Sequence, residues 1–161
     1  MNSHEELIGA TGTTAGGSQY LTFTLDNEEY GLEILRVQEI KGFSRLTPIP
    51  NTPRHVKGVL NLRGTVVPVI DLRVWFSLPE TEYTKFSVII VVTAGKRVVG
   101  LLVDAVSDVL TVGDGDRGAT PDLGSGVDTS FLAGMAKAGD RLVSLLNIDT
   151  LVPVDHHTTA V

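Results

Sequence analysis

Short apolar segments rich in β-branched residues recur along this chain, and turn-forming residues separate them. The 161 residues include 21 Val, 8 Ile and 17 Thr beside 19 Leu. β-Branched side chains are stiff at χ1 and favour strands over helices. Many short strands at regular spacing predict an all-β barrel or sandwich.

The predicted strands are short and follow one another closely: 20–25, 30–35, 58–62, 66–72, 87–93, 97–104, 106–112, 132–137 and 141–148. In the first of them Leu21, Phe23 and Leu25 alternate with Thr22 and Thr24, which predicts one buried and one exposed face. The strands 87–93 and 97–104 are almost wholly apolar and predict a hairpin buried on both faces.

Other segments predict interruptions of the β-structure. Residues 37–41 predict one helical turn that ends at Gly42, and a short helix begins near Pro53 with Thr52 as its cap. Pro68 cannot donate a ladder hydrogen bond, so its strand is expected at an edge or with a bulge. Residues 113–128 hold five Gly and four Asp and predict a long loop without regular structure.

The length predicts one domain over 18–153, with flexible tails at 1–17 and 154–161. A chain of this size buries about 68–70% of its unfolded surface, so it needs neither metal nor disulfide, and it has no Cys. The apolar run from Val88 to Val92 is far shorter than the roughly 20 residues of a membrane span. The N-terminal residues lack an apolar signal-peptide core, so a cytoplasmic protein is expected.

The charge distribution indicates protein partners. The formal net charge is −6, and the 13 basic residues are scattered singly. Nucleic acids and anionic membranes bind clustered cations, because counterion release drives that association. Only nine residues are aromatic, too few for a platform on which bases stack. We therefore expect no nucleic-acid partner and no membrane insertion.

No catalytic, metal or cofactor site is predicted. The spacing Gly113-Asp-Gly115-Asp-Arg-Gly118 matches a dinucleotide fingerprint, but no helix-forming segment follows, and the Asp residues would repel a pyrophosphate. Of the four His, only His55 lies outside the predicted tails, and no nucleophile motif accompanies it. The alternative to a protein-binding module is a small β-barrel that binds another ligand or catalyses an unrecognised reaction.

Two stretches, 30–40 and 56–73, combine polar residues with stiff apolar neighbours. The sequence resembles the CheW family of bacterial chemotaxis adaptors in Pro50-Asn-Thr-Pro53, Lys57-Gly-Val-Leu-Asn-Leu-Arg-Gly64 and Val67-Pro-Val-Ile-Asp-Leu-Arg73. The resemblance continues through 97–104 and 106–110 and covers essentially 20–152.

The resemblance implies an all-β fold of two small five-stranded SH3-like barrels packed around a shared hydrophobic core, with short helical turns. It implies an adaptor without catalytic activity or cofactors. Family members couple the cytoplasmic tips of chemoreceptors to the histidine kinase CheA, whose regulatory domain has the same fold. The expected state is a monomer in solution that joins rings in membrane-associated receptor arrays.

The resemblance also implies two binding surfaces. The receptor-binding residues are Ile34, Val37, Glu39, Gly58, Arg63, Val88 and Val106. The kinase-binding residues are Leu46, Val66, Asp122 and Leu123. Glu39 and Arg63 are expected to face each other. The residues by themselves leave other interpretations open, since the valines fit an ordinary core equally well and Gly58 and Gly64 fit backbone positions with positive φ.

Overall fold

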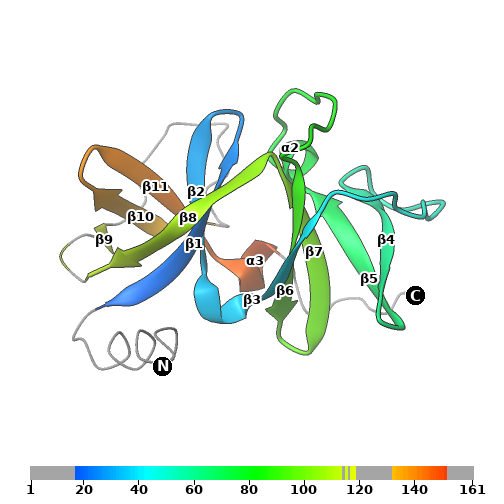
Figure 1. The fold of residues 1–161 in the computed structure, drawn as a ribbon, viewed down its shortest axis with the longest axis horizontal. Coiled ribbons are helices and arrows are strands. Elements are labelled where there is room, and N and C mark those ends of the chain that lie inside the picture. Colours follow the sequence, from blue (N-terminus) through cyan, green and yellow to red (C-terminus); the bar gives the residue numbers. More distant parts are fainter. Residues whose placement is uncertain (1–16, 114, 116, 119–131, 152–161) are drawn as a thin grey trace.

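Two β-sheets packed side by side make up the structure (Figure 1), a computed structural model that describes residues 17–113, 115, 117–118 and 132–151. The first sheet has the order β8-β1-β2-β11-β10-β9 and the second has the order β3-β6-β7-β5-β4. The strands of the first sheet are β1 (Ser18–Leu25), β2 (Glu28–Glu33), β8 (Ala105–Val112), β9 (Arg117–Gly118), β10 (Leu132–Ala138) and β11 (Arg141–Leu146). The strands of the second sheet are β3 (Val37–Gly42), β4 (Val56–Leu62), β5 (Thr65–Asp71), β6 (Val88–Ala94) and β7 (Arg97–Val103).

Three short helical segments join the strands. They are the 3-10 helix η1 (Ile34–Arg36), α2 (Leu72–Trp75) and α3 (Ile148–Leu151). No helix in the described ranges is long and apolar enough to cross a membrane.

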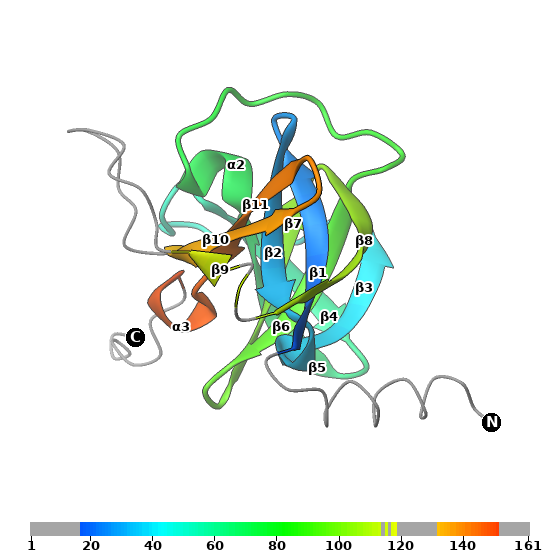
Figure 2. The same ribbon diagram turned by 90° about the vertical axis from the view of Figure 1, so that its left-hand side faces the viewer.

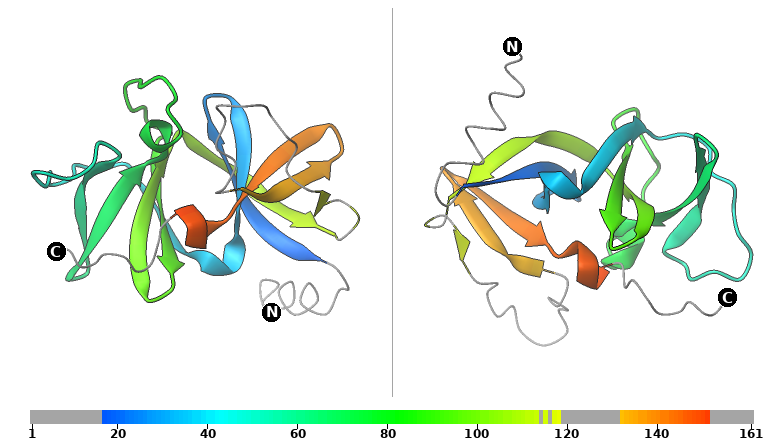
Figure 3. Two further views of the ribbon diagram at one scale, coloured as in Figure 1. Left: turned by 180° about the vertical axis from the view of Figure 1, so that it is seen from behind. Right: turned by 90° about the horizontal axis from the view of Figure 1, so that it is seen from below.

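The chain builds the two sheets in an intertwined order. It leaves the first sheet after β2, forms the whole second sheet and returns with β8. Each sheet contains one parallel pairing, β2 with β11 and β5 with β7, while the other pairings are antiparallel. Figure 3 shows the two sheets from behind and from below, with α3 between them. The predicted fold class is therefore confirmed, with the two-residue strand β9 added to the first sheet.

Three apolar clusters hold this arrangement together. The largest lies between the sheets and takes residues from both, among them Phe23 of β1, Ile90 of β6 and Leu101 of β7. A second cluster fills the second sheet's own barrel, and a third, which includes Tyr20, fills the first. Strands β1, β6 and β7 thus bury both faces, one toward a barrel interior and the other toward the shared core.

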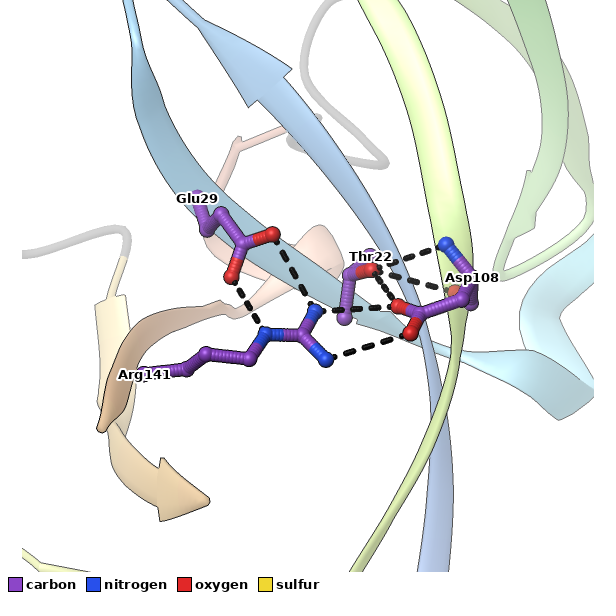
Figure 4. A network of polar contacts seen from close by, with 4 residues as sticks. All are labelled: Thr22, Glu29, Asp108 and Arg141. Carbon is purple, nitrogen blue, oxygen red and sulfur yellow. Dashed lines mark hydrogen bonds and ion pairs between the residues drawn. The ribbon is translucent and has the colours of Figure 1, made fainter. Parts of the chain in front are cut away.

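A polar network shows how strongly the first sheet curves. Arg141 on β11 donates to Glu29 on β2 at 2.9 and 3.1 Å and to Asp108 on β8 at 3.0 and 3.1 Å (Figure 4). Because β1 and β2 lie between β11 and β8, a flat sheet would separate those strands by about 14 Å. The sheet therefore curls, and Arg141 closes it. The fully buried Thr22 hydroxyl lies 2.5 Å from Asp108 Oδ1, which satisfies a polar group inside the barrel.

Two arginines form ion pairs where the two sheets meet. Arg73 of α2 donates to both carboxylate oxygens of Asp104 at 2.8 Å, and the Asp26 backbone N–H donates to the same carboxylate. Burial alone raises the pKa of Asp104, but the hydrogen bonds from Arg73 and Asp26 outweigh it and hold that pKa below its usual value. At the other end, Arg36 of η1 donates to both oxygens of Asp149 in α3.

Two predictions of helical structure are wrong. Residues 37–42 form the strand β3, and the helical turn lies just before it, at Ile34–Arg36. The burial of β3 alternates as it does along an edge strand, with a bulge between Val37 and Glu39. No helix begins at Pro53, because the Thr52 hydroxyl donates to the Ile49 carbonyl and stabilises a turn instead of a helix end.

Four smaller expectations also need correction. Thr22 is fully buried, since the second face of β1 lines the barrel interior instead of solvent. Pro68 lies in an interior strand, not at an edge, and the parallel pairing of β5 with β7 begins one residue later, at Val69. A bulge does occur next to it, on the β4 side of the pairing between Val56 and Gly58. Within 113–128, Arg117–Gly118 pairs with β10 as β9, and the final strand ends at Leu146 because Ile148 begins α3.

We expect Arg141→Met to lower the free energy of unfolding by about 1 kcal/mol at pH 7, since the network is partly exposed. Hydrogen bonds from Arg141 and then Thr22 lower the pKa of Asp108. The network therefore stabilises the fold above the unfolded carboxyl pKa of about 3.9 and loses this effect as the pH falls further. Urea unfolding should give a smaller difference in the free energy of unfolding between the wild type and Arg141→Met at pH 3 than at pH 7. Lys137→Met is the control. An equal difference at both pH values would contradict the assignment.

Candidate protein-binding surfaces

The two sheets meet along a line that we call the seam. A strip of partly exposed apolar side chains, the seam strip, runs along it. Ile34, Val37, Val88 and Val106 are all half-buried and all pack against the shared core. Strand register explains this placement, because Val37 lies opposite Val92 and Val106 lies opposite Phe23, and both of these partners belong to that core. Strands β3 and β8 flank the seam on the same side of the molecule (Figures 1 and 2). The structure thus brings four of the seven predicted receptor-binding residues together.

Two further apolar residues lie along this strip, and a third, Leu35, follows Ile34 in η1; the sequence prediction missed all three. Ile40 lies opposite Ile90 and Val109 lies opposite Leu21, so both face the shared-core side, yet they are 44% and 49% exposed. Leu35 of η1 is 92% exposed. An exposed apolar strip of this kind is typical of a surface that binds another protein. Alternation along 37–42 would have placed Ile40 on the face opposite Val37, and only the bulge between Val37 and Glu39 brings both to the shared-core side.

Glu39 and Arg63 do face each other, as predicted, at the rim of the second barrel. Arg63 Nη1 donates to Glu39 Oε1 at 3.3 Å and lies 3.3 Å from Oε2. The Arg63 side chain is 72% exposed, whereas Glu39 Oε2 is buried and accepts no hydrogen bond among the described residues. Glu39 lies opposite Val91, which belongs to the second barrel's core, so the pair does not share a face with Val37.

The backbone of Arg63 is held in an unusual conformation. Arg63 and Gly64 have φ values of 51° and 88° and form the two-residue turn between β4 and β5. Such a turn favours Asn or Gly at its first position, and a side chain in this region costs about 1–2 kcal/mol. The Asn61 side chain supports the turn by accepting from the Gly64 N–H. A strained residue with an exposed charge is a candidate for function, because folding alone would favour another residue there.

Gly58 has a structural role in this surface. It is buried, its φ is 152°, and a Cβ at this position would lie 2.5 Å from the Thr47 carbonyl oxygen. Thr47 and Val59 exchange backbone hydrogen bonds there, so β4 is covered by the segment that carries Leu46. Gly58 therefore packs against the backbone of the segment that carries Leu46, and it has no side chain to offer a partner.

The predicted kinase-binding residues lie apart from the seam strip. Leu46 is half-buried and packs against the core of the second barrel. Val66 is 62% exposed on the outer face of β5, since its neighbour Val67 points into the barrel. The structure therefore does not place Leu46 and Val66 on one face. Asp122 and Leu123 lie outside the described residues.

Few features of the described residues indicate catalysis, metal binding or a small-molecule site. No three His, Asp or Glu side chains there come close enough to hold a metal ion. His55 packs edge-on against Trp75 with a ring distance of 4.4 Å, and burial lowers its pKa. A small cavity of about 150 Å³ beside Asp71 is lined by groups that already bond one another, such as the Tyr83 hydroxyl, which donates to Asp71.

Comparisons with known proteins agree on one family. Residues 19–155 match the CheW-like domain. The chain is 46% identical to the chemotaxis protein CheW of Klebsiella aerogenes over 84% of this chain and 82% of that protein, and 40% identical to that of Rhizobium meliloti over 91% and 95%. The crystal structure of the scaffolding protein TtCheW from Thermoanaerobacter tengcongensis superposes with a TM-score of 0.80 at 34% identity, covering 87% of this chain and 95% of that one.

Gly58→Ala tests the structural role of Gly58. The added Cβ would collide with the Thr47 carbonyl and strain the backbone, so we expect a loss of about 1–3 kcal/mol in the free energy of unfolding. Gly42→Ala is the matched control, because nothing lies within 4 Å of the Cβ it would add. Urea unfolding measures both variants, and equal stabilities would refute the argument.

Proposed function

Because this chain belongs to the CheW family of non-catalytic chemotaxis coupling proteins, which link chemoreceptors to the histidine kinase CheA, we propose that it bridges these partners through two separate surfaces. The single observation that carries the proposal is the separation of two exposed apolar surfaces. One is the strip along the seam, and the other is the second barrel away from that strip, where Leu46 and Val66 lie on different faces. An adaptor needs such a division, since one shared surface would make its partners compete.

The seam strip is the surface proposed for the helical cytoplasmic tip of a receptor. Val37 and Ile40 on β3 stand across the seam from Val106 and Val109 on β8, which suits an amphipathic helix with apolar anchors on one face. The edges of the two sheets carry these anchors, so a helix can approach them without disturbing the shared core.

The Glu39–Arg63 pair is proposed to fix the orientation of the receptor tip. Glu39 is part of β3, the Arg63 charge is exposed, and one Glu39 carboxylate oxygen accepts no hydrogen bond from the described residues. Rim charges contribute mainly to association rate and specificity, while buried apolar anchors contribute affinity. Gly58 packs elsewhere on β4, against the Leu46 segment.

The kinase is proposed to bind the second barrel near Leu46 and Val66. The resemblance implies a second, ring-forming contact through Asp122 and Leu123, which lie outside the described residues. High effective concentration inside an array would multiply several weak contacts of this kind. Signalling follows if the adaptor binds two conformations of the kinase with different affinity. The proposed protein is cytoplasmic, monomeric in solution, and joins rings in membrane-associated receptor arrays.

The two-surface proposal predicts variants that separate the partners. Ile40→Asp should weaken binding of a receptor cytoplasmic fragment by about tenfold or more and leave CheA binding unchanged, since it places a charge among apolar anchors. Val66→Asp should do the reverse. Titration calorimetry with each purified partner tests both variants. Loss of both partners in one folded variant, or binding of neither partner by the wild type, would contradict the proposal.

Arg63→Asn separates function from stability at a single position. Asn tolerates positive φ, so the free energy of unfolding should stay the same or rise by up to about 1 kcal/mol. Receptor affinity should fall on the order of tenfold, because the rim charge is lost. Lys96→Asn in the turn between β6 and β7 is the matched control. A loss of stability without a loss of affinity would show that Arg63 serves the fold.

A further inference from the structure

An open basin on the second barrel surrounds Leu46 of the proposed kinase surface. Its volume is about 630 Å³, and it is lined by Phe43, Ser44, Arg45, Leu46, Lys57 and Tyr83. We propose that this basin, the Leu46 basin, receives an acidic segment of CheA that carries one aromatic or aliphatic side chain. This inference rests on the proposed function, because it extends the surface around Leu46.

The apolar part of the basin is fixed in advance of binding. The rings of Phe43 and Tyr83 pack 4.3 Å apart, and both remain about two-fifths exposed. The Tyr83 hydroxyl donates to Asp71 at 3.0 Å, and the same carboxylate accepts from the Arg73 N–H at the start of α2. The aromatic wall is therefore attached to a helix end and loses little conformational entropy on binding. Leu46 completes an apolar surface that can hold one large side chain.

The rim of the basin is positively charged in a chain of net charge −6. Arg45 makes no ion pair with any residue in the described ranges, and Lys57 reaches only Glu80, at 3.7 Å. Glu80 is in turn held closely by Arg54, so its negative charge is already shared. The rim thus keeps an excess of positive charge, which attracts carboxylates and disfavours a basic partner.

The shape of the basin indicates a peptide rather than a small anion. Its two cations stand at an open rim without the convergent, buried donors that hold a free phosphate. Two cations are also too few to follow a nucleic-acid backbone. Aromatic rings beside cations suit a segment in which carboxylates flank one apolar anchor.

Position assigns this segment to the kinase. Leu46 belongs to both the basin and the proposed kinase surface, and Gly58 packs directly behind it. The receptor strip faces the other side of β3, because Ile40 points toward the shared core. A receptor helix in the seam would leave the basin free.

The test reverses the charge of the rim. Arg45→Glu with Lys57→Glu should weaken CheA binding about tenfold at roughly 50 mM salt and make the remaining affinity less dependent on salt, as loss of a charged contact does. Lys96→Glu with Arg97→Glu is a control of equal charge change on the hairpin between β6 and β7. Phe43→Ser should weaken CheA binding at every salt concentration, because it removes the apolar wall.

The outcomes distinguish the inference from the proposed function. If Leu46→Asp abolishes CheA binding while the rim reversal has no effect, the basin proposal is wrong and the kinase surface stands. If neither variant affects CheA, both proposals fail. Equal losses in the rim reversal and the hairpin control would indicate only long-range charge and would overturn the basin. Thermal unfolding of each variant verifies that it is folded.

Discussion

The shared apolar core between the two sheets is the interaction on which the rest of this structure depends. Both sheets contribute strands that are buried on each face, so neither sheet is complete without the other. Phe23 from the first sheet and Ile90 and Leu101 from the second are each fully buried in it. The intertwined chain order strengthens this dependence, because β8 to β11, which complete the first sheet, follow all strands of the second sheet in the sequence. Ion pairs of Arg36 with Asp149 and of Arg73 with Asp104 then stabilise the two ends of the seam.

This construction also produces the binding surfaces. A sheet that packs through its centre leaves its edge strands only half covered, and side chains on those edges face the core while remaining open to a partner. Val37 on β3 and Val106 on β8 are in this position. The same residues therefore stabilise the fold and are available for docking, which explains why sequence reasoning from the residues alone gave each of them two interpretations.

Local sequence predicted the fold where one local signal was strong. The hairpin of β6 and β7 followed from two apolar runs around Gly95, and the buried face of β1 followed from Leu21, Phe23 and Leu25. Prediction failed where a distant partner decided the outcome. Residues 37–42 are too short and mixed to specify a strand, and they become one by pairing with β6. Thr22 is buried because the sheet curls and brings Asp108 to its hydroxyl.

The amino-acid sequence by itself determined the all-β class, the order of most strands, the family resemblance and the pairing of Glu39 with Arg63. The fold class and the strand order rest on residue type, alternation and spacing, whereas the expectation that Glu39 faces Arg63 came from the resemblance. Only the tertiary structure decided that Gly58 supports the Leu46 segment, that Ile40 and Val109 extend the seam strip, and that Phe43, Arg45 and Tyr83 share a basin. The physical reason is that each of these groupings joins segments through strand register and sheet curvature, which arise only when both sheets close on their common core.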